Sequence, residues 1–236
     1  MSSVPDSGRP APAADSTGIA ARIDRWVVFV TTSIMGIELA FLIWNGQWLN
    51  ALLVIAIILL VAGPSIFGPR LPVVMPAEIH VLAVIFIFSA LFLGEVRSYY
   101  EKIWWWDIVL HTSSGFLLGI VGFLLVYVLN ENKRVHLQMR PRFVALFAFL
   151  FAVTVGAFWE IFEFAMDSFF GMDMQKAMFD DDSGLTDTMW DLIVDIVGAL
   201  VISGLGWSYL HRKEQSFLQA WIRKFIARNP QLFEGR

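Results

Sequence analysis

The sequence contains no cysteine and few charged residues. The absence of Cys among 236 residues excludes a disulfide framework and excludes zinc or iron–sulfur sites built on thiolates. Charged residues make up only 16% of the chain, whereas a soluble domain carries about 25%. Hydrophobic residues make up 57%, and this excludes disorder for most of the chain, because disorder needs low hydrophobicity and high charge. The composition is typical of an integral membrane protein.

Basic patches and several catalytic motifs are also missing. The isoelectric point near 5.5 argues against a nucleic-acid partner. There is no Gly-rich phosphate loop, no GxSxG elbow and no HExxH motif. Ser113 and Ser114 follow His111 closely, but sequence neighbours point in different directions on a helix, so we do not expect a serine-based triad.

Six long apolar runs predict membrane spans. A spanning helix needs about 20 mostly apolar residues, and a helix satisfies its own backbone hydrogen bonds in lipid. The runs are Trp26–Trp44, Asn50–Ile66, Pro76–Leu93, Asp107–Leu129, Phe143–Phe164 and Trp190–Leu210. We therefore expect an all-α polytopic membrane protein, a bundle of six transmembrane helices that contacts membrane lipids.

The two ends of the chain differ from this bundle, which we place at residues 21–212. Residues 1–20 are rich in Ser, Pro and Ala and predict a disordered tail, without the basic and apolar regions of a cleaved signal peptide. Residues 213–236 predict a basic amphipathic helix and tail on the anionic inner leaflet. A docking helix for a membrane-protein partner is the alternative there, and a homo-oligomer is equally compatible with the composition.

The distribution of basic residues predicts the orientation. With both termini in the cytoplasm, 14 of the 17 Lys and Arg lie inside, and only Arg97, Lys102 and Lys176 lie outside. Thirteen Asp and Glu residues lie at the opposite, outer side or in the outer helix ends, which makes that side favourable for cations. We expect a multi-pass membrane protein with both termini in the cytoplasm.

Three of the predicted helices carry polar stripes at their outer ends. Spacings of three and four residues place the members of each stripe on one helix face. The stripes are Asp107 and His111, then Gly156, Glu160, Glu163 and Asp167, then Asp187, Asp191, Asp195 and Gly198. All three stripes therefore reach the same depth of the membrane.

These stripes predict a metal site. An isolated charge in lipid costs at least about 2.5 kcal/mol, and almost no Lys or Arg lies at this depth to compensate. The carboxylates must therefore bind protons or share a cation, and this donor set suits magnesium, manganese, iron or zinc. The candidate ligands are Asp107, His111, Glu160, Glu163 and Asp191. Asp187 and Asp195 are candidate catalytic residues that orient water or complete the ligand shell.

Simpler interpretations exist for several of these residues. His111 is compatible with a hydrogen-bonded packing role, and Glu160 and Glu163 with protonated carboxyls that clamp helices. Asp187 also fits a helix N-cap. The run at residues 180–182 starts like a calcium loop, although a solvated acidic loop fits it better, and Glu38 either joins the outer cluster or pairs with Trp or Asn side chains.

The segments Asp107…His111…Gly115, Glu160-Ile-Phe-Glu163 and Asp187…Trp190-Asp191…Gly198-Ala199 resemble the YjdF-like family of uncharacterised bacterial inner-membrane proteins. A wider likeness extends to VanZ-like membrane proteins, which are linked to glycopeptide-antibiotic tolerance. The resemblance covers about residues 25–210 and implies this architecture and site, but no activity. The acidic segment before the last motif departs from the family, which has a Gly-rich approach there.

Three functions follow from these observations. The leading hypothesis is a metal-dependent hydrolase that acts on a lipid or cell-envelope substrate at the outer leaflet. The second is a cation or proton pathway, because intramembrane acids mark such routes, although the inner halves of the last three runs are apolar. The third is a non-catalytic subunit of a membrane complex.

Overall fold

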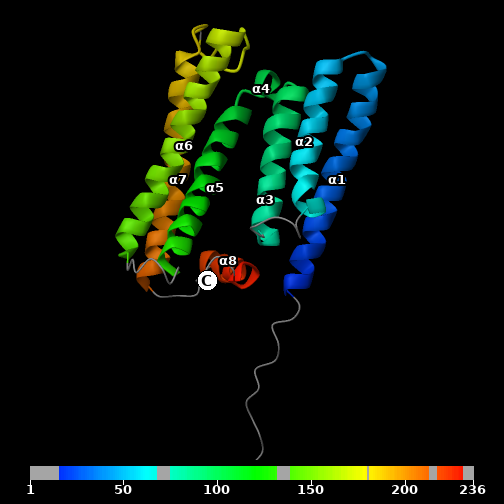
Figure 1. Ribbon diagram of the computed structural model, residues 1–236. Helices are drawn as coiled ribbons and strands as arrows, with labels where there is room; N and C mark the ends of the chain where they lie inside the picture. Colours follow the sequence, from blue (N-terminus) through cyan, green and yellow to red (C-terminus); the bar gives the residue numbers. More distant parts are fainter. Residues whose placement is uncertain (1–15, 68–74, 132–138, 180, 213–216, 231–236) are drawn as a thin grey trace, which may run out of the picture.

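The computed structural model describes residues 16–67, 75–131, 139–179, 181–212 and 217–230. Six of its helices are long and apolar enough to cross a membrane, which confirms the predicted all-α bundle of six spans. The elements are α1 (Ser16–Trp44), α2 (Trp48–Phe67), α3 (Ala77–Ile87), the π-helix η2 (Phe88–Val96), α4 (Tyr99–Lys102), α5 (Trp106–Glu131), α6 (Pro141–Phe170), α7 (Leu185–Arg212) and α8 (Phe217–Arg228). The π-helix continues α3, so the two elements together form one span (Figure 1).

The first helix begins earlier than the apolar pattern indicates. It starts at Ser16, ten residues before the predicted start at Trp26, so residues 16–20 belong to α1 and not to the predicted disordered tail. A polar contact explains why the extra turns are ordered, because Asp24 Oδ1 lies 2.6 Å from His80 Nδ1 on α3. Residues 1–15 lie outside the described ranges.

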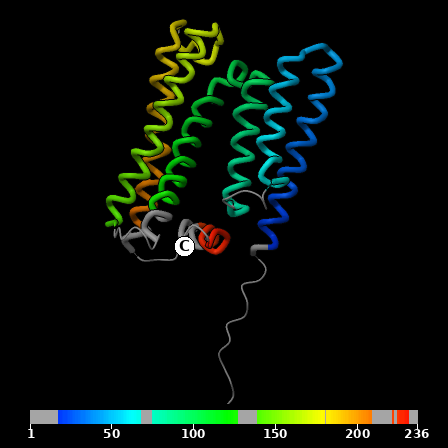
Figure 2. Tube along the Cα trace, in the orientation of Figure 1, coloured from blue at the N-terminus to red at the C-terminus, as the bar shows by residue number. Residues whose placement is uncertain are grey.

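The spans form two groups of three. Helices α1, α2 and α3 with η2 pack around a buried apolar cluster that includes Met35, Val54, Ile57 and Phe92. Helices α5, α6 and α7 make the most extensive packing in the bundle and form the second group. Figures 1 and 2 show α5 at the side of its group that faces α3. The three predicted polar stripes all belong to the second group.

The basic amphipathic segment forms a helix that lies across one end of the bundle. Phe225 of α8 is only 6% exposed and belongs to an apolar cluster with Ile79, Ile120 and Phe123. Lys224 forms an ion pair with Glu78 at the start of α3. Figure 1 shows α8 at the same end as the beginning of α1. The helix thus packs against the bundle, whereas the leaflet contact we predicted for this segment remains a prediction.

Two glycines allow α5 and α7 to pack closely. A Cβ added at Gly198 of α7 would meet the backbone carbonyl oxygen of Thr112, and a Cβ at Gly115 of α5 would meet that of Asp195. Helices in lipid associate through such small residues, because close approach of the backbones increases their van der Waals contact. This contact lies directly beside His111 and therefore sets the distance between the polar stripes of α5 and α7.

Candidate functional site

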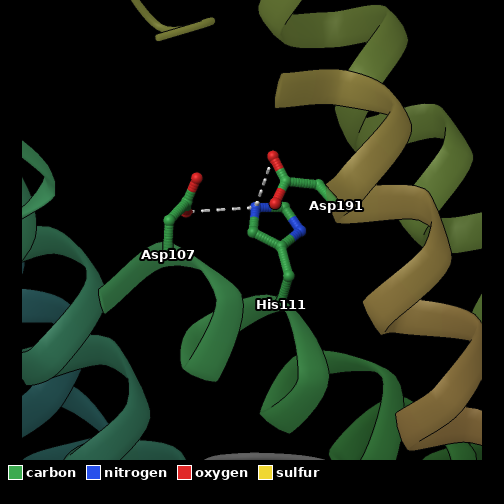
Figure 3. Close-up of side chains that lie close together, drawn as sticks. All are labelled: Asp107, His111 and Asp191. Atoms are coloured by element: carbon green, nitrogen blue, oxygen red, sulfur yellow. Dashed lines mark ion pairs between the residues drawn. The ribbon is translucent and has the colours of Figure 1, made fainter. Parts of the chain in front are cut away.

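The site begins at the first turn of α5. This helix starts at Trp106, so Asp107 lies in its first turn and His111 lies one turn further on. The four-residue spacing in α7 turns Asp191 and Asp195 toward α5, and Glu160 of α6 completes the enclosure. Figure 3 shows Asp107 and Asp191 on two sides of the same imidazole nitrogen.

One imidazole nitrogen faces two carboxylates. His111 Nε2 lies 3.5 Å from Asp107 Oδ1 and 3.9 Å from Asp191 Oδ2. One ligand atom from each of these three residues lies within 4.8 Å of the others. Two nitrogen or oxygen ligands of one zinc-sized ion are at most about 4.2 Å apart, because each lies about 2.1 Å from the metal. The distances at Nε2 are therefore compatible with one shared ion.

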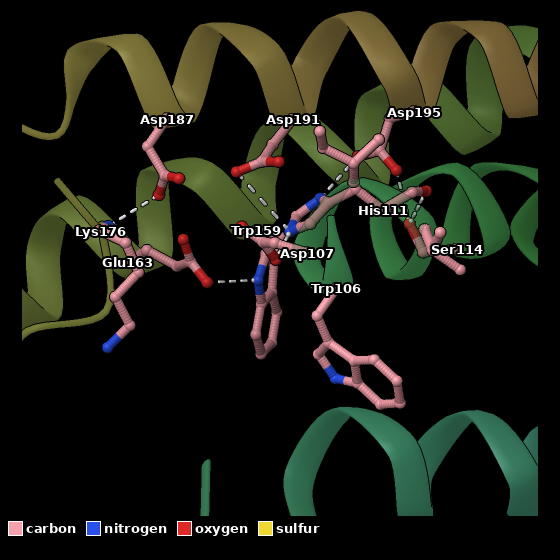
Figure 4. Close-up of polar contacts among 12 residues, drawn as sticks. Trp106, Asp107, His111, Ser114, Trp159, Glu163, Lys176, Asp187, Asp191 and Asp195 are labelled. Atoms are coloured by element: carbon pink, nitrogen blue, oxygen red, sulfur yellow. Dashed lines mark hydrogen bonds and ion pairs between the residues drawn. The ribbon is translucent and has the colours of Figure 1, made fainter. Parts of the chain in front are cut away.

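The other imidazole nitrogen faces a second pair of carboxylates. His111 Nδ1 lies 3.5 Å from Asp195 Oδ2 and 3.7 Å from Glu160 Oε1. Ser114 Oγ donates to Asp195 Oδ1 at 2.5 Å, as Figure 4 shows. A metal-binding His usually directs its second nitrogen to a carboxylate, which fixes the ring orientation. Asp195 lies on the side of Nδ1 where such a carboxylate would be, at 3.5 Å and without a well-directed hydrogen bond, and Ser114 holds Asp195.

Two carboxylates of the site are deeply buried, and their only charged partner in the described structure is the His111 imidazole. Glu160 is 3% exposed and Asp191 is 1% exposed. Among the described residues, none makes a well-directed hydrogen bond to either oxygen of these two side chains. A buried carboxylate without such bonds is costly, because it has lost its water without gaining a replacement. The site thus presents unpaired oxygen donors together with one imidazole.

Positive charge is scarce around these donors. His111 is near four carboxylates, and in the described part of the chain no Lys or Arg forms an ion pair with any of them. Lys176, in the loop between α6 and α7, directs its ammonium group to the backbone oxygen of Asp173 instead. A cation therefore fits this site better than an anion does.

Two of the predicted residues lie at the edge of the cluster. Glu163 Oε1 accepts a hydrogen bond of 2.8 Å from the indole Nε1 of Trp159, one turn earlier on α6. Asp187 Oδ2 accepts a hydrogen bond of 2.8 Å from the Lys176 backbone amide, while its buried Oδ1 has no partner in the described structure. Neither residue belongs to the group of three that could share an ion.

The acidic loop before α7 is organised by its own side chains. Asp181 accepts hydrogen bonds from the hydroxyls and backbone amides of Ser183 and Thr186. These bonds hold the pKa of the Asp181 carboxyl below its ordinary value. The Asp181 carboxylate thus binds the residues at the beginning of α7, which argues against the calcium-loop interpretation. Asp180 lies outside the described residues. Asp187 is already inside the first turn of α7, so it is not the N-cap.

Glu38 has a partner that neither of our two expectations included. Its Oε1 lies 2.9 Å from Nη1 of Arg97, the residue that follows η2. The pair joins α1 to the segment before α4 in the first group of helices. Both expectations for Glu38 were wrong, because the sequence does not show that the chain after η2 places Arg97 next to α1.

Sequence analysis missed two polar partners of the site. We did not expect Ser114 to act as a nucleophile, but its hydroxyl donates a hydrogen bond to Asp195. The spacing of three residues between His111 and Ser114 on one helix is the signal that could have predicted this contact. Trp159 was not considered, although it lies four residues before Glu163 and therefore on the same face. Both side chains position carboxylates.

Gly156 supplies a test of how tightly Asp195 is positioned. A Cβ at Gly156 would meet Asp195 Oδ2, the oxygen that faces His111. We expect Gly156→Ala to weaken metal binding about 10- to 100-fold, the effect of disturbing a partner of a ligating His. The helix itself should not suffer, because Ala has the higher helix propensity. Metal titration of the purified variant, with Gly36→Ala on α1 as the control, measures the effect; equal affinities would contradict it.

The fold and this cluster together define a polytopic α-helical membrane protein with a buried carboxylate–histidine site near one end of the bundle. The chain belongs to the family described as predicted membrane protein (DUF2238), whose model matches residues 25–212. This confirms the resemblance to the YjdF-like proteins, which form that family. The wider likeness to VanZ-like proteins stays a prediction.

A relative from Thermotoga maritima, described as an uncharacterized protein, is 31% identical over 111 residues. The match covers 47% of this chain and 52% of the relative, so it spans about half the length of that protein. No solved structure matches the chain.

Proposed function

We propose that this protein is a metal-dependent membrane hydrolase whose site holds a divalent ion. The observation that carries the proposal is the group formed by Asp107, His111 Nε2 and Asp191, whose ligand atoms lie within 4.8 Å of one another inside the bundle. The unpaired, deeply buried oxygens of Asp191 and Glu160 support it, since a cation compensates them without a basic side chain. The ion is magnesium, manganese, iron or zinc.

Each residue of the site has a role in this proposal. Asp107, His111 and Asp191 are the ligands, and Glu160 is close enough to His111 to complete the shell. Glu163, bound by Trp159, is an outer neighbour of Glu160. Asp195 is a positioning residue that sets the orientation of the His111 ring and is itself held by Ser114. A bound divalent ion supplies a Lewis acid and an activated water molecule.

Asp187 is the candidate for directing that water. Its Oδ2 is fixed by the Lys176 amide, while its buried Oδ1 has no hydrogen bond among the described residues. It lies one helical turn before Asp191 on α7. A fixed carboxylate with one unpaired oxygen, one turn from a ligand, is suited to accept a proton from water or to orient it.

The location of the site supports a lipid or cell-envelope substrate. The ligands lie within the first two turns of α5 and α7, at the end of the bundle opposite α8 (Figure 1). The distribution of Lys and Arg assigns that end to the outer side of the membrane. The scarcity of basic side chains is unfavourable for a phosphate bound by protein alone, but a divalent ion compensates a phosphate or polarises an ester.

The structure is less favourable to a continuous ion pathway. Between the site and α8 lies an apolar cluster that contains Ile120, Phe123, Ala148 and Ile202. An ion would have to cross this cluster without polar ligands, which is costly in a medium of low dielectric constant. The cation or proton pathway and the non-catalytic subunit are therefore the alternative functions if the test below fails. The non-catalytic subunit predicts a partner protein in the purified material.

Elemental analysis of the detergent-purified protein tests the proposal. We expect about one divalent ion per chain in the wild type and a loss of at least about tenfold in occupancy for His111→Gln and Glu160→Gln. The matched control is Asp24→Asn, which removes the carboxylate of another Asp–His pair, the one with His80. This control should retain the wild-type metal content.

Metal-free wild-type protein that is folded by circular dichroism would contradict the proposal. Full metal content in both site variants would show that other residues bind the ion and would contradict the ligand assignment. A loss of metal from Asp24→Asn equal to that of the site variants would show that the effect is not specific to the site.

A further inference from the structure

An apolar groove lies beside the site on the neighbouring face of α5. It has a volume of about 470 Å³, within the range of pockets that hold small ligands. It runs between α3 with η2 on one side and α5 with α7 on the other. Its walls include Leu82, Phe86, Trp106, Leu110, Phe116 and Val201. The groove thus lies between the two groups of helices.

The polar groups in its walls are satisfied by the protein itself. Thr112 Oγ1 donates to the Ile108 carbonyl at 2.7 Å, and Ser113 Oγ donates to the Val109 carbonyl at 2.6 Å. Because these hydroxyls already donate to the helix backbone, they do not require a polar ligand. The chemistry of the walls therefore favours an apolar occupant.

Both ends of the groove are closed by contacts between helices. At the end near the site, the Trp106 indole Nε1 donates to the Ser89 carbonyl of η2 at 3.3 Å. A π-helix shifts the backbone hydrogen-bond register by one residue, and Ser89 lies at its beginning. At the opposite end, Phe225 of α8 packs with Ile79 and Ile120. The remaining opening is lateral.

The lateral opening faces lipid. Ile85 and Val109 are each 47% exposed and Val201 is 50% exposed, and all three line the groove. They belong to helices that are long and apolar enough to span the membrane. The medium at this depth is hydrocarbon, so the occupant that can enter from the side is a lipid chain.

The length of the groove matches one leaflet. Along α5 it extends from Trp106 to Leu117, eleven residue steps, which correspond to about 17 Å at 1.5 Å per residue. Half of the hydrocarbon core of a bilayer is about 15 Å. A helix from a second protein would need the full thickness, whereas a single acyl chain fills one half.

Trp106 connects this groove to the site. It precedes Asp107 directly, so its indole lies at the top of the groove while the next side chain faces His111. Figure 4 shows the indole of Trp106 pointing away from the cluster of carboxylates. A lipid whose chain lies in the groove would therefore have its polar head within reach of the candidate metal ligands.

We propose that the groove between α3 and α5 binds one acyl chain of a membrane glycerolipid, with the head group at the Asp107, His111 and Asp191 site. This inference rests on the proposed function for the role of the head group, and it names an acyl lipid as the substrate class. The binding of the chain depends only on the apolar groove.

Photocrosslinking of the full chain in lipid nanodiscs tests the proposal. The probe is a phosphatidylethanolamine with a diazirine at the end of one acyl chain, and adducts are mapped by peptide mass spectrometry. Because the head group lies at the site, we expect adducts to concentrate at the far end of the groove, on residues 82–86 and 113–117. Ser113→Phe places a ring in the groove and should lower this labelling about tenfold. Displacing two methylenes of the chain costs about 1.6 kcal/mol of burial, which corresponds to about a factor of ten in binding.

The matched control is Ser33→Phe, which adds the same ring to an exposed position of the spanning helix α1. It should leave the labelling unchanged. Val201→Trp, at the exposed rim, is a second variant that narrows the entrance without filling the interior. Labelling of α5 no greater than that of the exposed face of α1, or unchanged by both groove variants, would overturn the proposal.

The metal content of the same samples separates the two proposals. Groove labelling that is lost in Ser113→Phe while the metal is retained supports both. Groove labelling in a metal-free wild-type protein supports the acyl groove and contradicts the proposed function. A metal-loaded protein without groove labelling contradicts the acyl groove and leaves the metal site supported.

Discussion

Asp191→Asn is expected to remove metal binding and, at the same time, to stabilise the metal-free protein. Asp191 is 1% exposed, and among the described residues neither of its oxygens has a well-directed hydrogen-bond donor. Without an ion, its only ion pair in the described structure is the long one to His111 Nε2 at 3.9 Å, and a buried group without hydrogen bonds costs about 1–3 kcal/mol, or more when charged. The neutral amide lowers this cost but is a poor ligand, so we expect the metal affinity to fall by more than about 100-fold.

Thermal unfolding in detergent, with chelator and with added divalent ion, measures both effects. A ligand present at about 100 times its dissociation constant stabilises the folded state by about 2.7 kcal/mol, so the wild type should unfold at a clearly higher temperature with metal. Asp191→Asn should show no such shift and should exceed the wild type in chelator. Asp24→Asn, which removes the carboxylate from the pair with His80, is the control: it should keep the metal-dependent shift of the wild type, while its unfolding temperature in chelator should not exceed that of the wild type. A full metal-dependent shift in Asp191→Asn would refute its role as a ligand.

Asp187→Asn should separate catalysis from metal binding. Asp187 lies outside the group of three that could share an ion, so its amide variant should keep the metal content of the wild type. If its buried Oδ1 orients or deprotonates the attacking water, turnover should fall about 10²- to 10⁴-fold, the usual contribution of a positioned general base. The hydrogen bond from the Lys176 amide to Oδ2 should persist in the variant, because the amide side chain retains one oxygen acceptor.

Hydrolysis of fluorogenic acyl-ester and phosphodiester lipids in nanodiscs measures this loss. Metal content determined on the same preparation shows whether the effect is catalytic. Asp173→Asn is the control, because its carboxylate is exposed and belongs to the same loop as Lys176. Full turnover in Asp187→Asn would disprove its catalytic role, and a parallel loss of metal would reassign it to the ligand shell.

The secondary structure could be predicted closely from the sequence, because apolar length and helical spacing are local properties. All six predicted spans correspond to helices that are long and apolar enough to cross a membrane. The π-helix η2 and the short helix α4 were not predicted, and the largest difference in a boundary is the beginning of α1, where Asp24 and neighbouring polar residues interrupt the apolar pattern. Their order depends on the contact with His80, more than 50 residues away in sequence, and no local pattern reports such a contact.

The candidate site could be predicted as a set of stripes but not as a set of contacts. Spacings of three and four residues placed Glu160 and Glu163 on one face of α6. The packing then directs Glu160 toward His111, while Glu163 accepts a hydrogen bond from Trp159. The two residues differ by three positions, and the tilt and rotation of α6 against α5 decide which of them reaches the imidazole.

The sequence by itself therefore determined that the chain is an all-α membrane bundle and that its acids and His111 gather at one end. These features depend on hydropathy and helical periodicity, which act within a single helix. Only the tertiary structure decided that Asp107 and Asp191 share one imidazole nitrogen, that Asp195 and Ser114 face the other, and that Glu38 pairs with Arg97. The physical reason is that periodicity defines the face of a helix, whereas its neighbour is chosen by close packing, here through Gly115 and Gly198 between α5 and α7.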